Sequence, residues 1–296
     1  MRTLLLLFTL CASATAQAPN EELNTLLMHA TFRITGPDTK EQEKISFGTV
    51  FFMGKPVKDD PKNSYAVLVT AAHVLDGIKG DIATLAMRRR SPEGTYTAFD
   101  YQFNIRKNNV PLYVKHPSVD VAAMYTEVPI NLPITAISTD FLTDDKRIED
   151  LEIHPGDIAL CLGFPLAAMN GGAFPFLRGG RLASYPLTPA TSVKEWTFDA
   201  AIMVGNSGGP VYFYYENRMQ KGQVRLGYEQ GILGLVIQQI DSSIPEFAKL
   251  PLNYGVIVPA HYIKETMDLL PEEPARKPFI RQIVVPRIVP LLRKKN

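Results

Sequence analysis

One short stretch, Gly205-Asn206-Ser207-Gly208-Gly209-Pro210, decides how the rest of this sequence is interpreted. Its glycines allow positive φ angles and a close approach of the backbone, as in a tight turn. In such a turn the N–H groups of Gly205 and Ser207 can point into one small concavity that would hold an oxyanion. Ser207 is therefore a candidate nucleophile. The alternative is a plain glycine-rich turn, but the serine leads directly into the aromatic-rich strand expected over 211–215.

A serine nucleophile needs a histidine to take its proton and a carboxylate to orient that histidine. The continuous apolar stretch 65–70 predicts a buried strand, and it runs into Ala71-Ala72-His73, whose small alanines leave the imidazole free to stand over a cleft. Asp120 begins another apolar stretch, where a charge is costly unless it has a hydrogen-bonded partner. We expect His73 to be that partner. His116 is a rival base, which we interpret as a loop residue.

Composition places the chain among ordinary globular proteins. It has 296 residues, of which 46% are hydrophobic and 21% are charged, enough for one large domain or two smaller ones. The formal net charge of +1 argues against nucleic acid or a strongly acidic substrate as the main partner.

The N-terminus has the three-part form of a secretory signal peptide. Met1-Arg2 is followed by an apolar run, which is too short to span a bilayer, and then by small residues. We predict cleavage after Ala16 and a periplasmic or secreted location. A lipoprotein signal is the alternative, but Thr9-Leu10 puts a bulky residue before Cys11. The mature chain would keep only Cys161, which we expect to be a buried apolar residue rather than a reactive thiol.

Many short strands punctuated by glycine and proline predict an all-β architecture, with helices only near the termini. Helical spacing predicts one helix over 20–30 and another around 263–270. The polar, proline-containing stretch 55–64 predicts a loop, and the basic run 88–90 predicts a solvated turn.

In order along the chain, Leu68-Val69-Thr70-Ala71-Ala72-His73, Asp120-Val121-Ala122 and the glycine-flanked serine resemble a chymotrypsin-fold, trypsin-like serine protease. The resemblance covers roughly residues 30–270. Within that superfamily the sequence most resembles the HtrA/Deg-like branch. The features that carry this narrower resemblance are Asp199-Ala200-Ala201-Ile202, Gly156-Asp157, Gly163-Phe164-Pro165 and Tyr254-Gly255-Val256-Ile257-Val258-Pro259.

The resemblance implies two six-stranded antiparallel β-barrels with an active site between them. It divides the chain into a signal peptide (1–16), an N-terminal helix with the first barrel (17–135), the second barrel with a C-terminal helix (136–270) and a basic tail (271–296). Only 26 residues follow Leu270, too few for the PDZ domain that HtrA proteins usually append. Asn206 stands where many trypsin-like enzymes carry an aspartate that pairs with a new N-terminus, so zymogen activation through that pair is not expected.

The resemblance also implies the site. His73, Asp120 and Ser207 would be catalytic, with Gly205 and Ser207 forming the oxyanion hole. The floor of the specificity pocket would fall at Ala201, whose lack of charge favours apolar, small to medium P1 residues over Lys or Arg. Ile237, Gln238 and Gln239 would pair with the substrate backbone, and the loop 167–178 would shape one wall.

The sequence therefore predicts an exported serine endopeptidase that hydrolyses peptide bonds through an acyl-enzyme, with a polypeptide substrate and no metal or organic cofactor. The alternative from another class is a catalytically silent binding or scaffold protein on the same fold. An esterase is disfavoured because Ser207 leads into a strand rather than a helix. The tail carries seven Lys or Arg and two Glu. It is either an extended arm on the body or a contact for a partner or an anionic surface, and a homo-oligomer stays open.

Overall fold

The computed structural model describes residues 22–41, 43–126, 134–165, 174–224, 226–241, 251–272 and 280–282. The predicted signal peptide and most of the basic tail lie outside these residues. Most of the loop 167–178 and the side chain of Gln239 do so as well. None of the helices in the described ranges has the length and apolar character needed to cross a bilayer.

The N-terminal half is built on one large sheet. Its strands are β1 (Thr31–Pro37), β2 (Ile45–Val57), β3 (Asp60–Thr70), β4 (Ile82–Arg90), β5 (Tyr96–Asn104), β8 (Val114–Lys115), β9 (Ala122–Tyr125), β10 (Ile137–Ser138) and β19 (Ile280–Gln282). Their main order is β5-β4-β1-β2-β3-β9-β8, while β10 pairs with β2 and β19 with β3. The short strands β6 (Arg106–Lys107) and β7 (Val110–Pro111) form a separate pair.

The C-terminal half is a closed antiparallel barrel. It consists of β11 (Ile158–Gly163), β12 (Phe176–Leu182), β13 (Trp196–Asp199), β18 (Pro251–Pro259), β17 (Tyr228–Asp241) and β14 (Pro210–Glu216), in that order around the barrel. A hairpin of β15 (Met219–Gln220) and β16 (Gln223–Val224) extends from it. Trp196, Phe198 and Phe213 fill the barrel, together with Cys161. Cys161 is fully buried, as predicted, and burial raises the pKa of its thiol to about 12.

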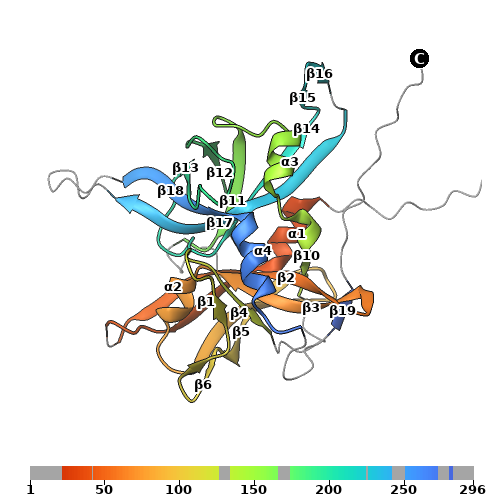
Figure 1. Cartoon of the computed structure of the whole chain (residues 1–296). Helices are drawn as coiled ribbons and strands as arrows, with labels where there is room; N and C mark the ends of the chain where they lie inside the picture. Colours follow the sequence, from red (N-terminus) through yellow and green to blue (C-terminus); the bar gives the residue numbers. More distant parts are fainter. Residues whose placement is uncertain are drawn as a thin grey trace, which may run out of the picture.

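The helices are short. They are α1 (Leu23–Ala30), α2 (Ala72–Asp76), α3 (Asp145–Asp150) and α4 (Ala260–Asp268), with a 3-10 turn η1 (Thr139–Phe141). The periodic apolar residues of α1 are all buried, as their helical spacing predicted. Figure 1 shows the barrel in the upper half and the large sheet in the lower half, with α1 and α4 between them.

Side chains from both halves bind α1, and a lysine of the N-terminal half binds the end of α4. Gln230 of β17 accepts the Leu23 N–H at the start of α1 (2.9 Å), and Arg88 of β4 donates to the His29 carbonyl near its end (2.9 Å). Lys55 of β2 donates to the carbonyl oxygens of Met267, in the last turn of α4, and of Leu270, just after it, at 3.1 and 2.9 Å. The two halves therefore meet through defined polar contacts as well as through a shared core.

The predicted all-β class is confirmed, and the six-stranded antiparallel barrel is found in the C-terminal half. In the N-terminal half the described residues instead form a nine-stranded sheet. The stretch 55–64, predicted as a loop, extends the β2–β3 hairpin, because β19 pairs with its edge. The basic run 88–90, predicted as a solvated turn, ends β4, and Arg88 in it is only 2% exposed.

Candidate active site

His73 and Asp120, expected to be partners from the sequence, are in contact. His73 lies in α2, which begins just after β3, and Asp120 lies just before β9. The ring Nδ1 of His73 is 2.5 Å from the Asp120 Oδ2, and the His73 backbone N–H donates to Oδ1 at 2.9 Å. The carboxylate thus fixes both the ring and the first turn of the helix that carries it.

The same contacts set the charge state of Asp120. Partial burial alone would raise the pKa of its carboxyl. The hydrogen bonds and the charge of His73, with a further bond from the Ala72 N–H, outweigh burial and hold that pKa below its ordinary value. Asp120 is therefore a carboxylate near neutral pH, which is the form that can orient an imidazole.

The serine loop has the backbone shape that its glycines predict. Gly205 has a φ of +100° and Gly208 a φ of +84°, both in the region that favours glycine. The loop is closed by bonds from the Asn206 N–H to the Met203 carbonyl (3.0 Å) and from the Gly209 N–H to the Asn206 carbonyl (2.9 Å). Within the described residues, neither the Gly205 N–H nor the Ser207 N–H donates to a protein acceptor. Two main-chain donors are thus left beside the Ser207 side chain.

Thr49 of β2 attaches this loop to the N-terminal sheet. Its N–H donates to the Ser207 carbonyl at 2.9 Å, and its hydroxyl donates to the Gly205 carbonyl at 2.7 Å. The same hydroxyl accepts the Phe164 N–H at 3.1 Å. Sequence reasoning missed Thr49, although a hydroxyl in the middle of an apolar strand was a usable signal, because a buried polar group needs a partner.

Glycines let the serine loop approach α2. A side chain on Gly208 would meet the Thr70 Oγ1 at 2.1 Å and the Ala71 N at 3.1 Å, so the loop backbone lies directly against the end of β3. A side chain on Gly48 of β2 would meet both Val74 of α2, at 2.7 Å, and the Ser207 carbonyl, at 3.3 Å. The residues before and after His73 are thus neighbours of the residues around Ser207.

The Ser207 hydroxyl itself donates to the Ile237 carbonyl, at a long 3.5 Å. No hydrogen bond in the described part of the chain joins it to His73. The structure thus brings His73 and Asp120 together and places the Ser207 loop against the end of β3, just before His73, while the serine–histidine bond stays a prediction.

Of the residues predicted to bind substrate, Ile237 contacts the serine loop through its carbonyl. Ala201 is half-buried, Ile237 is 8% exposed, and Gln238 is exposed at the surface. Ile202, which sequence reasoning did not single out, is buried, and its Cγ1 lies 2.6 Å from where a Cβ on Gly255 would stand. An apolar side chain therefore fills the space beside the predicted pocket floor, and Gly255 leaves room for it.

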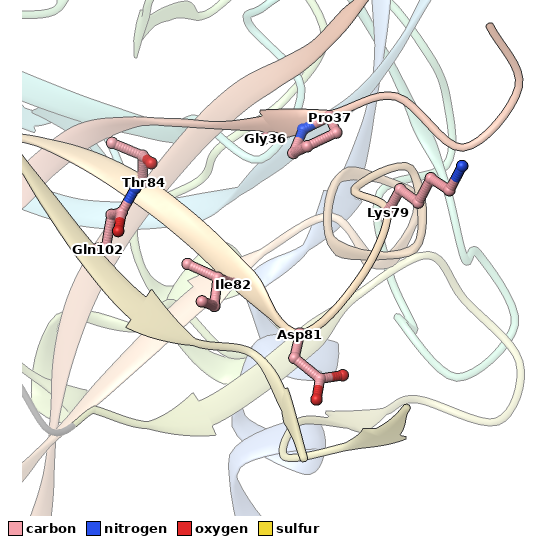
Figure 2. A pocket seen from close by; sticks show the side chains of 7 residues that line it. All are labelled: Gly36, Pro37, Lys79, Asp81, Ile82, Thr84 and Gln102. Atoms are coloured by element: carbon pink, nitrogen blue, oxygen red, sulfur yellow. The ribbon is translucent and has the colours of Figure 1, made fainter. Parts of the chain in front are cut away.

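The hollow drawn in Figure 2 lies elsewhere. Its volume is about 320 Å³, and its lining residues are Gly36, Pro37, Lys79, Asp81, Ile82, Thr84 and Gln102. None of these is a predicted site residue, and the Asp81 carboxylate already accepts the N–H groups of Asn108 and Asn109. Among the described residues, no group of three or more His, Cys, Asp or Glu could hold a metal ion.

The comparisons with known proteins give a limited result. No protein-family model and no curated protein matches the sequence. Among solved structures, the chain is similar to the active form of the Rv3671c protease from M. tuberculosis, with 16% identity and a TM-score of 0.46 over 96% of this chain and 97% of that one. The function is therefore inferred from the residues of the site.

Proposed function

We propose that this protein is a serine endopeptidase whose catalytic residues are His73, Asp120 and Ser207. The observation that carries the proposal is the bidentate contact of Asp120 with the ring and backbone of His73. It is supported by the serine loop, where two main-chain donors have no acceptor among the described residues. A structural ion pair would not need an adjacent serine whose neighbours are all glycines or a buried asparagine.

In the proposed cycle, His73 takes the Ser207 proton as the hydroxyl oxygen attacks the peptide carbonyl. Asp120 holds the imidazole in the tautomer that carries hydrogen on Nδ1, so that Nε2 is free to accept the proton. The N–H groups of Gly205 and Ser207 donate to the developing oxyanion. His73 then protonates the leaving amine, and water hydrolyses the acyl-enzyme by the same steps in reverse. The missing bond between Ser207 and His73 does not exclude this, since catalytic hydrogen bonds are often long before substrate binds.

The chemistry around Ala201 supports apolar, small to medium P1 residues. Neither Ala201 nor Ile202 carries a charge that could pair with Lys or Arg. Met203 and Val204, just before Gly205, expose 36% and 61% of their surfaces, which suits an apolar substrate next to the reacting serine. A cleavage profile dominated by Lys or Arg at P1 would overturn this part of the proposal.

The membership of the HtrA/Deg-like branch, the export of the chain after cleavage at Ala16 and its periplasmic or secreted location are proposed on the sequence motifs alone. So are the contact of the basic tail with a partner or anionic surface and the formation of a homo-oligomer. The pairing of β19 with β3 supports the other role of the tail, an arm on the body, for residues 280–282.

A second candidate function is a silent binding protein on the same fold. The observation that favours it is the hydrogen bond of the Ser207 hydroxyl to the Ile237 carbonyl rather than to His73. In this alternative the cleft would hold a peptide without cutting it, and the His73–Asp120 pair would only stabilise the start of α2.

Covalent labelling separates the two. A fluorophosphonate probe reacts with an activated serine, so we expect it to label the wild-type chain but not Ser207→Ala. The exposed Ser192 provides a matched control, and Ser192→Ala is expected to label like the wild type. Cleavage of an unfolded protein should fall by a factor on the order of 10⁶ in kcat when Ser207 is lost. Equal labelling of the wild type and Ser207→Ala, or none of either, would contradict the enzyme and favour the binding protein.

A further inference from the structure

The segment 116–121 between β8 and β9, which carries Asp120, is closed into a loop by His116. The His116 N–H donates to the Val121 carbonyl at 2.9 Å, and the Val121 N–H donates to the Val119 carbonyl at 3.0 Å. Asp120 thus lies on a short, internally bonded loop rather than on a strand. Whatever holds His116 therefore acts on the position of the Asp120 carboxylate.

The side chain of His116 is held at both ring nitrogens. Nδ1 accepts the Ser118 N–H at 3.2 Å, so in the neutral ring the hydrogen is on Nε2. Nε2 lies 3.1 Å from the Glu265 Oε2 of α4 and donates to it. The side chain is only 8% exposed, and its ring meets the Tyr262 ring edge-on with 5.1 Å between centroids. These contacts leave His116 neither free nor exposed, which is unsuited to the rival-base role.

The partner residue Glu265 belongs to the C-terminal half. It sits on the same helix as His261, whose Nε2 is 3.2 Å from the Glu265 Oε1, and the helix is fixed by the Tyr262 hydroxyl, which donates to the Ala190 carbonyl at 2.7 Å. The titratable groups of α4 that contact the His116 ring are therefore Glu265 and Tyr262, and His261 in turn contacts Glu265. In Figure 1, α4 lies between the two halves.

We propose that His116 is a positioning residue, which Glu265 of α4 holds in the orientation that keeps the Asp120 loop, and with it the His73 imidazole, in place. The inference rests on the proposed function for its effect on activity. It goes beyond that function because it makes the C-terminal helix part of the support of a carboxylate from the N-terminal half.

Substitutions at His116 can remove its two side-chain hydrogen bonds, to Ser118 and to Glu265, one at a time. Asparagine keeps the bond to Ser118, because its side-chain oxygen reaches the N–H two residues on. Glutamine keeps a donor for Glu265 but does not have an acceptor at the Nδ1 position, and alanine loses both. We expect His116→Ala to lower kcat roughly ten- to hundredfold with KM little changed, because a small misplacement of catalytic groups is costly. We expect each conservative variant to recover part of this loss.

A second readout does not depend on activity. The His73 N–H donates to Asp120, whereas the next amide on α2, that of Val74, donates to the Ala71 carbonyl at 3.1 Å. In His116→Ala the hydrogen exchange of the His73 amide should accelerate on the order of tenfold, the effect of losing one hydrogen bond, relative to that of Val74. Global destabilisation would accelerate hydrogen exchange at both amides alike. The ratio of the two exchange rates therefore reports on the hydrogen bond between His73 and Asp120 alone.

The control on the same helix is Asp268→Asn, which removes an exposed ion pair with Lys264 at the C-terminal end of α4 and should leave kcat and the exchange ratio unchanged. Glu265→Ala should behave like His116→Ala. The positioning role would be overturned if the ratio of the His73 to the Val74 exchange rate stayed at the wild-type value in His116→Ala and in both conservative variants. If the wild type fails to label with fluorophosphonate, the proposed function fails, but the exchange ratio still decides whether His116 positions Asp120.

Discussion

The hydroxyl of Thr49 donates a hydrogen bond to the carbonyl oxygen of Gly205 at 2.7 Å. Thr49 belongs to the N-terminal sheet and is fully buried, whereas Gly205 begins the serine loop of the C-terminal barrel. One hydroxyl therefore joins the half that supplies His73 and Asp120 to the half that supplies Ser207. The geometry of the proposed oxyanion hole depends on the contact between the two halves.

Thr49→Val tests this link. Valine keeps the shape of the side chain but leaves the Gly205 carbonyl and the Phe164 N–H without their shared partner. An unsatisfied buried group costs about 1–3 kcal/mol, so we expect the free energy of unfolding to fall by that amount in urea titrations. Fluorophosphonate labelling at Ser207 should also slow. Thr49→Ser retains the hydroxyl and should keep most of the labelling rate, and equal labelling by the valine and serine variants would contradict the role of this bond.

Gly48→Ala tests the close approach of α2 to the serine loop. The added methyl group would meet the Val74 Cγ1 at 2.7 Å and the Ser207 carbonyl at 3.3 Å. Overpacking of this kind costs about 1–3 kcal/mol, so we expect a lower free energy of unfolding together with slower labelling. The control is Gly179→Ala in β12, where the methyl group would meet only the Leu160 Cδ2, at an ordinary 3.5 Å. If both variants lost similar amounts of unfolding free energy and labelling rate, the effect would come from replacing any strand glycine by alanine and not from the contact between α2 and the serine loop.

The features that could be predicted from the sequence are those with a local signature. The apolar run of β3 predicts a buried strand, the glycines around Ser207 predict a turn with positive φ, and a carboxylate at the start of an apolar strand predicts a partner. Because His73 was the partner that the chemistry required, the contact between His73 and Asp120 could be inferred without coordinates.

The features that could not be predicted depend on residues far apart in the chain. Thr49 reads as an ordinary strand threonine, since its acceptor is 156 positions away, and the partner of His116 is 149 positions away. The stretch 55–64 has the polar residues and proline of a loop, yet it is a hairpin because Lys55 is bound to the end of α4 and β19 covers its edge. The composition of a segment indicates which local structure it favours in isolation. It does not indicate which distant residues will bind its polar groups.

The low pKa of Asp120 predicts a specific pH dependence of stability. A carboxyl whose pKa is lower in the folded state stabilises that state above its unfolded pKa, about 3.9, and loses this effect as the pH falls through the folded value. We expect the wild type to be more stable than Asp120→Asn at pH 6 and the difference to narrow below pH 4, as measured by thermal unfolding. Near neutral pH, the same variant should lose about 10⁴ in kcat, because asparagine favours the wrong imidazole tautomer. A stability difference that is constant from pH 3 to pH 6 would contradict the charge of Asp120 as its source.

Arg88→Lys tests how α1 is held. The Arg88 guanidinium lies over the rings of Phe32 and Phe174, with distances of 4.0 and 4.5 Å to the ring centroids, and it donates to the His29 carbonyl. Lysine keeps the charge but cannot stack as a flat group, so this exchange is not conservative at a buried site. Since a desolvated cation–π contact contributes about 2 kcal/mol, we expect a loss of that size in the free energy of unfolding. The neighbouring Arg89 is exposed and lies 5.1 Å from the Phe99 ring centroid, so Arg89→Lys should change stability little. Equal effects of the two substitutions would show that the charge, not the stacking, holds α1 to the sheet.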